Sequence, residues 1–115
     1  MDFCDNATAK GLYDIGYDFP KRLMVDYFGV YDTIEYDDRI HLFDAQKFLR
    51  KRLNVIVEVF VDDDSDRPVT YNVHKDNECV CHHHGNYYSI DEWDDALLEG
   101  IRTAIKIIRG EYERD

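Results

Sequence analysis

At 115 residues, with 44% hydrophobic side chains, the chain is long enough to bury about two-thirds of its unfolded surface as one domain over residues 1–115. Its 25 acidic and 14 basic residues give a net charge of −11, which argues against direct binding to nucleic acids or anionic membranes, since both require a basic face. The sequence has no leader pattern or membrane-spanning run, and its three cysteines are an odd number that fits reduced thiols. We therefore expect a cytoplasmic protein.

The N-terminal third predicts a helix followed by two strands. Asp5 is placed to cap a helix over about residues 6–15, and Gly16 can adopt the left-handed conformation that ends it. Alternating side chains over residues 22–28 predict a strand, and residues 33–37 are expected to return as a short partner strand.

The middle of the chain predicts a helix and a three-stranded meander. Apolar residues at helical spacing indicate a helix over residues 43–53, and alternating valines indicate a strand over residues 55–61. Short polar turns connect this strand to two more, over residues 69–74 and 79–84, so all three should pair antiparallel. The helix also carries the basic cluster of the chain, which we interpret as its solvated face: Lys47, Arg50, Lys51 and Arg52.

The last third predicts a helix over residues 90–109, the most strongly specified element of the sequence. Ser89 and Glu92 have the spacing of a capping box, and Gly110 is suited to end the helix. Trp93 is expected to be buried against the sheet because it belongs to the inner apolar stripe, Trp93, Leu97, Ile101, Ala104 and Ile108. The predicted fold class is therefore α+β, an antiparallel sheet flanked by helices.

One group of residues has the side chains of a zinc site. Cys79, Cys81 and His83 alternate along the last predicted strand, and His74 lies on the strand before it. Alternate residues of a regular strand are about 6.5–7 Å apart, too far to chelate one ion without a kink. We therefore favour the interpretation that both cysteines pack as small hydrophobic residues, and we predict neither a metal nor another cofactor.

An acidic turn has part of the spacing of a calcium loop. Asp62, Asp64 and Asp66 occupy alternate positions, as in the first half of such a loop. Arg67 stands where the loop needs glycine, and Val73 stands where it needs a bidentate glutamate. We interpret this segment as a solvated hairpin tip.

The sequence contains no catalytic motif. It has no glycine-rich phosphate loop, no nucleophile elbow and no zinc-protease signature. Cys4 or Cys81 could be paired with His74 or His41 as a thiol dyad, but any chain with cysteines and histidines allows such a pairing. We expect that the protein is not an enzyme and has no catalytic residues.

Three segments resemble small uncharacterised proteins carried by prophages and mobile elements of gut bacteria. Residues 9–18 (AKGLYDIGYD) resemble their A-K-x-L-x-x-L-G-F-D helix, and residues 45–54 (AQKFLRKRLN) resemble their A-x-x-W-L-R-E-x-H-N helix. Residues 88–108 resemble their last helix, Y-x-S-Y-E-E-A-L-E-A-A-I-x-x-A-L-x-L-I. The chain departs from the pattern at Phe48 and at Arg52-Leu53. The resemblance implies a cytoplasmic accessory protein of a phage or mobile element, with no activity or site residue attached.

The helix–three strands–helix order also occurs in double-stranded-RNA-binding domains. Those domains need lysines at the start of the last helix to hold phosphates. Here all charged residues at the start of the last helix are acidic: Asp91, Glu92, Asp94 and Asp95. Their charge excludes RNA binding through that end of the helix.

Three functional hypotheses follow from these observations. The leading one is a non-enzymatic interaction module whose partner is another protein or, as a homodimer, a second copy of the chain. The alternative is an acidic nucleic-acid mimic that inhibits a host DNA-binding protein; the third is a metal-dependent protein using the cysteines and histidines. Mimicry predicts that the tip at residues 62–66 and the start of the last helix share one side, so that their charges form a single negative field.

Overall fold

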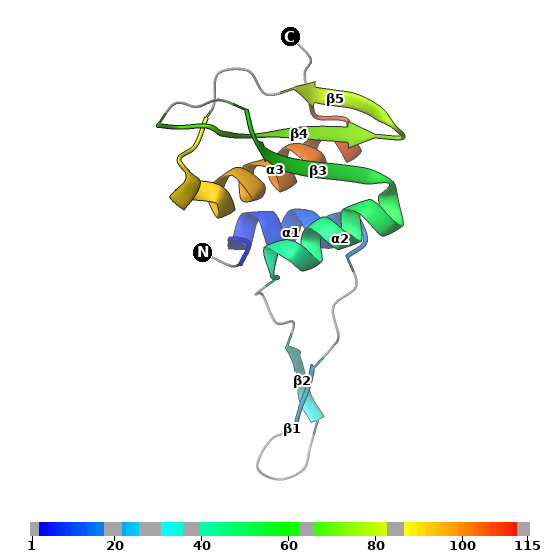
Figure 1. The fold of residues 1–115 in the computed structure, drawn as a ribbon. Coiled ribbons are helices and arrows are strands. Elements are labelled where there is room, and N and C mark those ends of the chain that lie inside the picture. Colours follow the sequence, from blue (N-terminus) through cyan, green and yellow to red (C-terminus); the bar gives the residue numbers. More distant parts are fainter. Residues whose placement is uncertain are drawn as a thin grey trace.

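The computed structural model describes residues 3–17, 40–62, 66–82 and 87–112, together with the backbone of residues 22–25 and 31–35. Its helices in these ranges are α1 (Asn6–Asp14), α2 (Leu42–Leu53) and α3 (Trp93–Ile108), preceded by a 3₁₀ turn η1 (Ile90–Glu92). The strands are β1 (Arg22–Val25), β2 (Tyr31–Glu35), β3 (Val55–Val61), β4 (Val69–Lys75) and β5 (Glu78–His82). The predicted α+β class is confirmed (Figure 1).

Side-chain caps and glycines predicted from the sequence are found at the starts and ends of the helices. The Thr8 amide donates to the Asp5 carboxylate at 2.8 Å, and Gly16 has a φ of 101°. The Ser89 amide donates to the Glu92 carboxylate at 3.0 Å, which is the reciprocal half of the predicted capping box. This hydrogen bond lowers the pKa of Glu92. Gly110, with a φ of 74°, follows α3.

The main sheet is an antiparallel meander in the order β3–β4–β5. β3 pairs with β4 in unbroken register from Val55 opposite Lys75 to Val61 opposite Val69. The pairing of β4 with β5 contains an irregularity, because Val73 lies opposite Cys81 while His74 lies opposite Cys79. Residues 83–84, which the sequence assigns to the last strand, lie outside the described residues.

All three helices lie on one side of this sheet (Figure 1). α3 packs across β3 and β4, α2 packs against β3 and α3, and α1 packs on α3. Gly100 allows the close approach of α3, since a Cβ there would lie 2.5 Å from Val57 Cγ1 and 3.3 Å from Tyr71 Cδ2. The core therefore sits between the helices and the inner face of the sheet, and its largest fully buried side chains include Tyr71, Leu12, Ile40, Leu49, Leu97 and Ile101.

Polar contacts fix α3 to its neighbours. The buried Tyr71 hydroxyl lies 3.1 Å from Thr103 Oγ1, which also donates to the Glu99 carbonyl at 2.9 Å. Arg102 binds the Asp5 carboxylate and donates to Thr8 Oγ1 at 3.2 Å, so it joins α3 to the cap of α1. These contacts satisfy polar groups that would otherwise be costly inside the packed region.

The remaining two strands form a separate antiparallel hairpin, which we call the arm. Leu23 lies opposite Ile34, and a register shift then places Val25 opposite Tyr31. Figure 1 shows the arm standing away from the helices and the main sheet. The radius of gyration is accordingly 16.5 Å, against about 13 Å for a compact domain of this length. Residues 26–28 and 36–37 of the predicted strands lie outside the described residues.

Among the described residues, no helix combines the length and the apolar character needed to cross a bilayer.

Candidate functional site: an apolar end and a basic face

The described cysteines and histidines do not converge. A bulge at Val80 makes Cys81 the partner of the buried Val73 and makes Cys79 the partner of His74, so the two cysteines lie on opposite faces of the sheet. Cys81 is 3% exposed and packs in the core, whereas Cys79 is exposed. The expectation that both pack as small hydrophobic residues is therefore wrong for Cys79, because a bulge reverses the alternation of a strand. His83 lies outside the described residues.

The side chain of His74 lies beside a carboxylate. Its Nε2 lies 3.5 Å from the Glu58 carboxylate on the adjacent strand, on the side of the sheet opposite the helices. Among the described residues, no group of three His, Cys, Asp or Glu side chains is placed to hold one metal ion.

The Cys4 thiol is poorly suited to nucleophilic chemistry. It is buried, and burial raises its pKa to about 11, with a smaller opposing effect from the positive charge of Arg102. The side chain is therefore a neutral thiol near pH 7, whereas a reactive cysteine needs thiolate character.

β3, α2 and α3 bring distant parts of the sequence to one end of the molecule. Val61 at the end of β3 pairs with Val69, and Val69 in turn exchanges backbone hydrogen bonds of 2.9 and 2.7 Å with Tyr88, just before η1 and α3. Only Asn54 separates α2 from β3, and the two elements run in opposite directions. The first residues of α2 and the last residues of β3 therefore lie toward the same end of the molecule (Figure 1). The start of α2, the end of β3 and the start of α3 therefore share this end.

Exposed apolar side chains collect here, and we call this surface the apolar end. It consists of Phe43 (69% exposed), Val61 (58%), Ile90 (66%) and Trp93 (36%). Of the large apolar side chains that are exposed in the described part of the chain, only Ile56 lies elsewhere, near the start of β3.

The predicted burial of Trp93 against the sheet is wrong. Leu97, Ile101 and Ala104 of the same stripe are buried, but Trp93 is the first residue of α3, where the core thins. Val61, which continues the inward-facing series of β3 at that end, is also mostly exposed. A helical pattern identifies the buried face of a helix, but it does not indicate how far along the helix the covering sheet extends.

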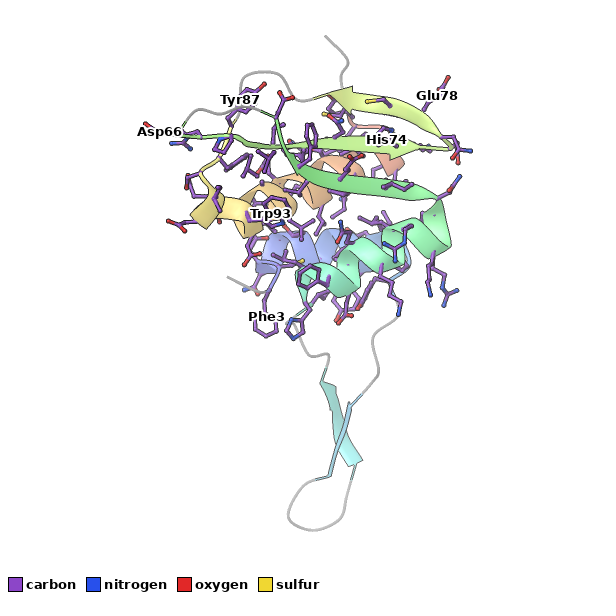
Figure 2. All side chains as sticks on the ribbon, viewed as in Figure 1. Phe3, Asp66, His74, Glu78, Tyr87 and Trp93 are labelled. Carbon is purple, nitrogen blue, oxygen red and sulfur yellow. The ribbon has the colours of Figure 1, made fainter. Side chains whose placement is uncertain are left out.

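The segments that form the apolar end also carry carboxylates. The described ones are Asp44, Asp62, Asp66, Asp91, Glu92, Asp94 and Asp95. Figure 2 shows Asp66, Tyr87 and Trp93 toward this end of the molecule, with Glu78 toward the other. Arg67 lies among the acids: its Nη2 is 3.3 Å from Glu92 Oε1, and its Nε donates to the Tyr87 carbonyl at 3.0 Å. The Tyr87 hydroxyl donates to Asp62 at 3.1 Å, so a chain of polar contacts runs from Asp62 through Tyr87 and Arg67 to Glu92 of η1, just before α3.

The opposite charge is concentrated on the outside of α2. The predicted solvated cluster is exposed as expected, and we call it the basic face: Lys47, Arg50, Lys51 and Arg52. Beside it is a shallow cavity of about 270 Å³ with an aromatic wall, because the Tyr17 and Phe48 rings meet edge to face at 5.0 Å. The cavity is lined by Tyr17, Asp44, Lys47, Phe48, Lys51 and Arg52.

Sequence patterns did not identify either surface as a site. Phe43 and Ile90 fall outside the apolar stripes of their helices, which is the one signal that the sequence offered for the apolar end. Tyr17 follows the end of α1 and meets Phe48 only through tertiary packing.

Comparisons with known proteins do not assign this chain: no protein family, curated protein or solved structure matches it. The relation to prophage proteins therefore stays a prediction.

Proposed function

We propose that the protein acts by binding another protein through its apolar end, in a binding role and not a catalytic one. The supporting observation is that four exposed apolar side chains stand on segments that share one end of the molecule, and that the same segments carry seven described carboxylates, which we call the rim. Single exposed apolar residues are ordinary on protein surfaces, whereas a group of them with a polar rim is typical of an interaction site. Trp93 is the expected centre, since tryptophan is enriched among the residues that dominate binding energy.

The charge of the rim defines the chemistry of the partner. A surface with carboxylates around an apolar centre is complementary to one with lysines or arginines around an apolar projection. The proposed role is that of an accessory protein of a phage or mobile element, which is the setting that the sequence resemblance implies.

A matched pair of variants tests this function. Ile56 is 38% exposed and Trp93 is 36% exposed, so Ile56→Ala and Trp93→Ala remove similarly accessible apolar side chains from different places. Proteins retained by the wild-type chain from cells of its source would be quantified by mass spectrometry against both variants. We expect a specific partner to be lost with Trp93→Ala and retained with Ile56→Ala. Equal retention by both variants would refute the assignment of the apolar end.

The second candidate is an acidic mimic of nucleic acid, and the link from Asp62 through Tyr87 and Arg67 to Glu92 of η1 favours it. In that case the partner is a DNA-binding protein, and duplex DNA should compete for it. Replacing Asp62, Asp64 and Asp66 together with Asn would abolish binding by a mimic, whereas it would leave binding centred on Trp93 nearly intact. The third hypothesis, a protein that depends on a Cys/His metal site, would require one bound zinc per purified, untagged chain and unfolding by a chelator.

A further inference from the structure

The arm is a two-stranded hairpin that stands apart from the other elements. A two-stranded hairpin is at best marginally stable alone in water, and strands become stable when a third strand or a helix covers an apolar face. The described strands of the arm pair with each other, and Figure 1 shows them standing clear of the main sheet and the helices. Neither β1 nor β2 has an extensive contact with another described element, such as the contact of α3 with β3 and β4.

The register gives the arm one apolar face. Residues opposite each other in an antiparallel pair share a face, as do residues two apart along a strand. The positions of Leu23 and Ile34 therefore share a face with those of Val25 and Tyr31, while the bulge leaves Asp32 as the extra residue. The arm thus combines an apolar face with the acidic residues of β2.

The basic face of α2 is complementary to the arm. Four cations stand on it, and the neighbouring cavity has the aromatic rings of Tyr17 and Phe48 in its wall. The aliphatic stems of lysine and arginine also cover apolar surface while their charged ends remain in water. A ligand for this surface should carry carboxylates and apolar side chains together, and β2 (YDTIE) has both, with Arg22 of β1 opposite its Glu35.

We propose that the arm of one chain docks on the basic face of α2 in a second copy, and that the reciprocal contact forms a closed homodimer. The occupant is a second copy because the arm carries carboxylates and an apolar face, which complement the cations of α2 and the aromatic wall of the cavity beside them. A contact in which each copy gives its arm and receives the other's is isologous, so it closes at two chains. This dimer uses none of the four apolar side chains of the apolar end, and the two surfaces share only the carboxylate Asp44, which lines the cavity. The variants at Lys47, Lys51 and Trp93 therefore test the dimer and the proposed function separately.

Charge reversal on α2 tests the docking surface. Sedimentation equilibrium of the full chain should give twice the chain mass of 13.7 kDa at high concentration. Lys47→Glu with Lys51→Glu should raise the dissociation constant by about tenfold or more, because the basic face loses its net positive charge at both contacts. The control is Lys10→Glu with Lys106→Glu, which changes the net charge equally on exposed lysines of α1 and α3 and should leave the constant unchanged.

A charge swap decides between docking and a general effect of charge. Arg22→Glu, Asp32→Lys and Glu35→Lys together reverse the charge of the arm and keep an opposite-charge pair where Arg22 faces Glu35. Alone, the arm variant and the α2 variant should each be monomeric; mixed, they should form a one-to-one heterodimer. Circular dichroism would verify that both are folded. A wild-type chain that stays monomeric at every concentration, a mixture that fails to associate, or a mass that grows beyond the dimer would overturn the proposal.

Discussion

Gly100→Ala tests how closely α3 packs on the sheet. A Cβ at this position would lie 2.5 Å from Val57 Cγ1, whereas carbon atoms in favourable contact lie about 3.5–4.0 Å apart. Val57 is fully buried and β-branched on a strand, so its side chain has few other rotamers to adopt. The added methyl group must therefore push the helix from the sheet or strain Val57.

The magnitude follows from two opposing effects. Overpacking a core by one methylene costs about 1–3 kcal/mol, and this contact belongs in the upper part of that range because it is so short. Alanine in a helix is more favourable than glycine by about 1 kcal/mol, which offsets part of the loss. We expect Gly100→Ala to lower the free energy of unfolding by about 1–2 kcal/mol, as measured by urea denaturation followed by circular dichroism.

Gly11→Ala is the matched control, since Gly11 is also a buried helical glycine. Its Cβ would meet Ile105 Cγ2 at 3.2 Å and Cδ1 at 3.3 Å, contacts that a small shift of one side chain relieves. We expect its stability to be close to that of the wild type. Adding Val57→Ala should reduce the loss caused by Gly100→Ala, with a coupling of about 1 kcal/mol in the double-mutant cycle. A Gly100→Ala protein as stable as the wild type, or equal losses for both glycines, would refute this packing.

Three further outcomes follow from burial and hydrogen bonding, each measurable by urea denaturation. Trp93→Ala should cost about 1 kcal/mol, well below the 2–5 kcal/mol expected for Leu97→Ala, because Trp93 is partly exposed; a larger loss for Trp93 would contradict its position. Tyr71→Phe should cost about 0.5–1.5 kcal/mol, since Thr103 keeps its bond to the Glu99 carbonyl. Burial raises the pKa of Cys4 from 9.0 to about 11, so stability should fall as pH rises across that interval, less steeply in Cys4→Ala; identical profiles would exclude this contribution.

The order and type of the elements could be predicted because their signals are local. The β3 strand begins and ends at the predicted residues, 55 and 61, since inward-facing valines alternate along it and a left-handed Asn54 separates it from α2. α1 begins at its predicted cap, whereas the predicted cap at Ser89 precedes the 3₁₀ turn η1, and α3 itself begins after that turn, at Trp93. At both caps a side chain satisfies a free amide within four residues of itself. Neither feature depends on what the rest of the chain does.

The features that define the candidate sites depend on contacts between elements, and no local pattern indicates them. Cys79 and Cys81 are two residues apart and would share a face of a regular strand, yet the bulge at Val80 separates them. Trp93 has the helical phase of a core residue but lies where α3 begins and the core thins. The cavity beside the basic face exists because Tyr17 and Phe48 meet from different segments.

The net charge of the chain sets a condition that the proposed dimer must meet. Two copies that each carry −11 repel one another over long distances, while the arm and the basic face attract one another locally. Salt screens the long-range repulsion first, since its range is about 30 Å at 0.01 M and about 8 Å at 0.15 M, and it weakens the close pairs only at higher concentration. Dimerisation should therefore be tightest at an intermediate ionic strength. Binding of a mimic to a basic groove should instead weaken steadily with salt, because there the long-range and the local forces are both attractive. A dissociation constant for the homodimer that rises continuously from the lowest salt concentration would contradict a local contact between two acidic chains.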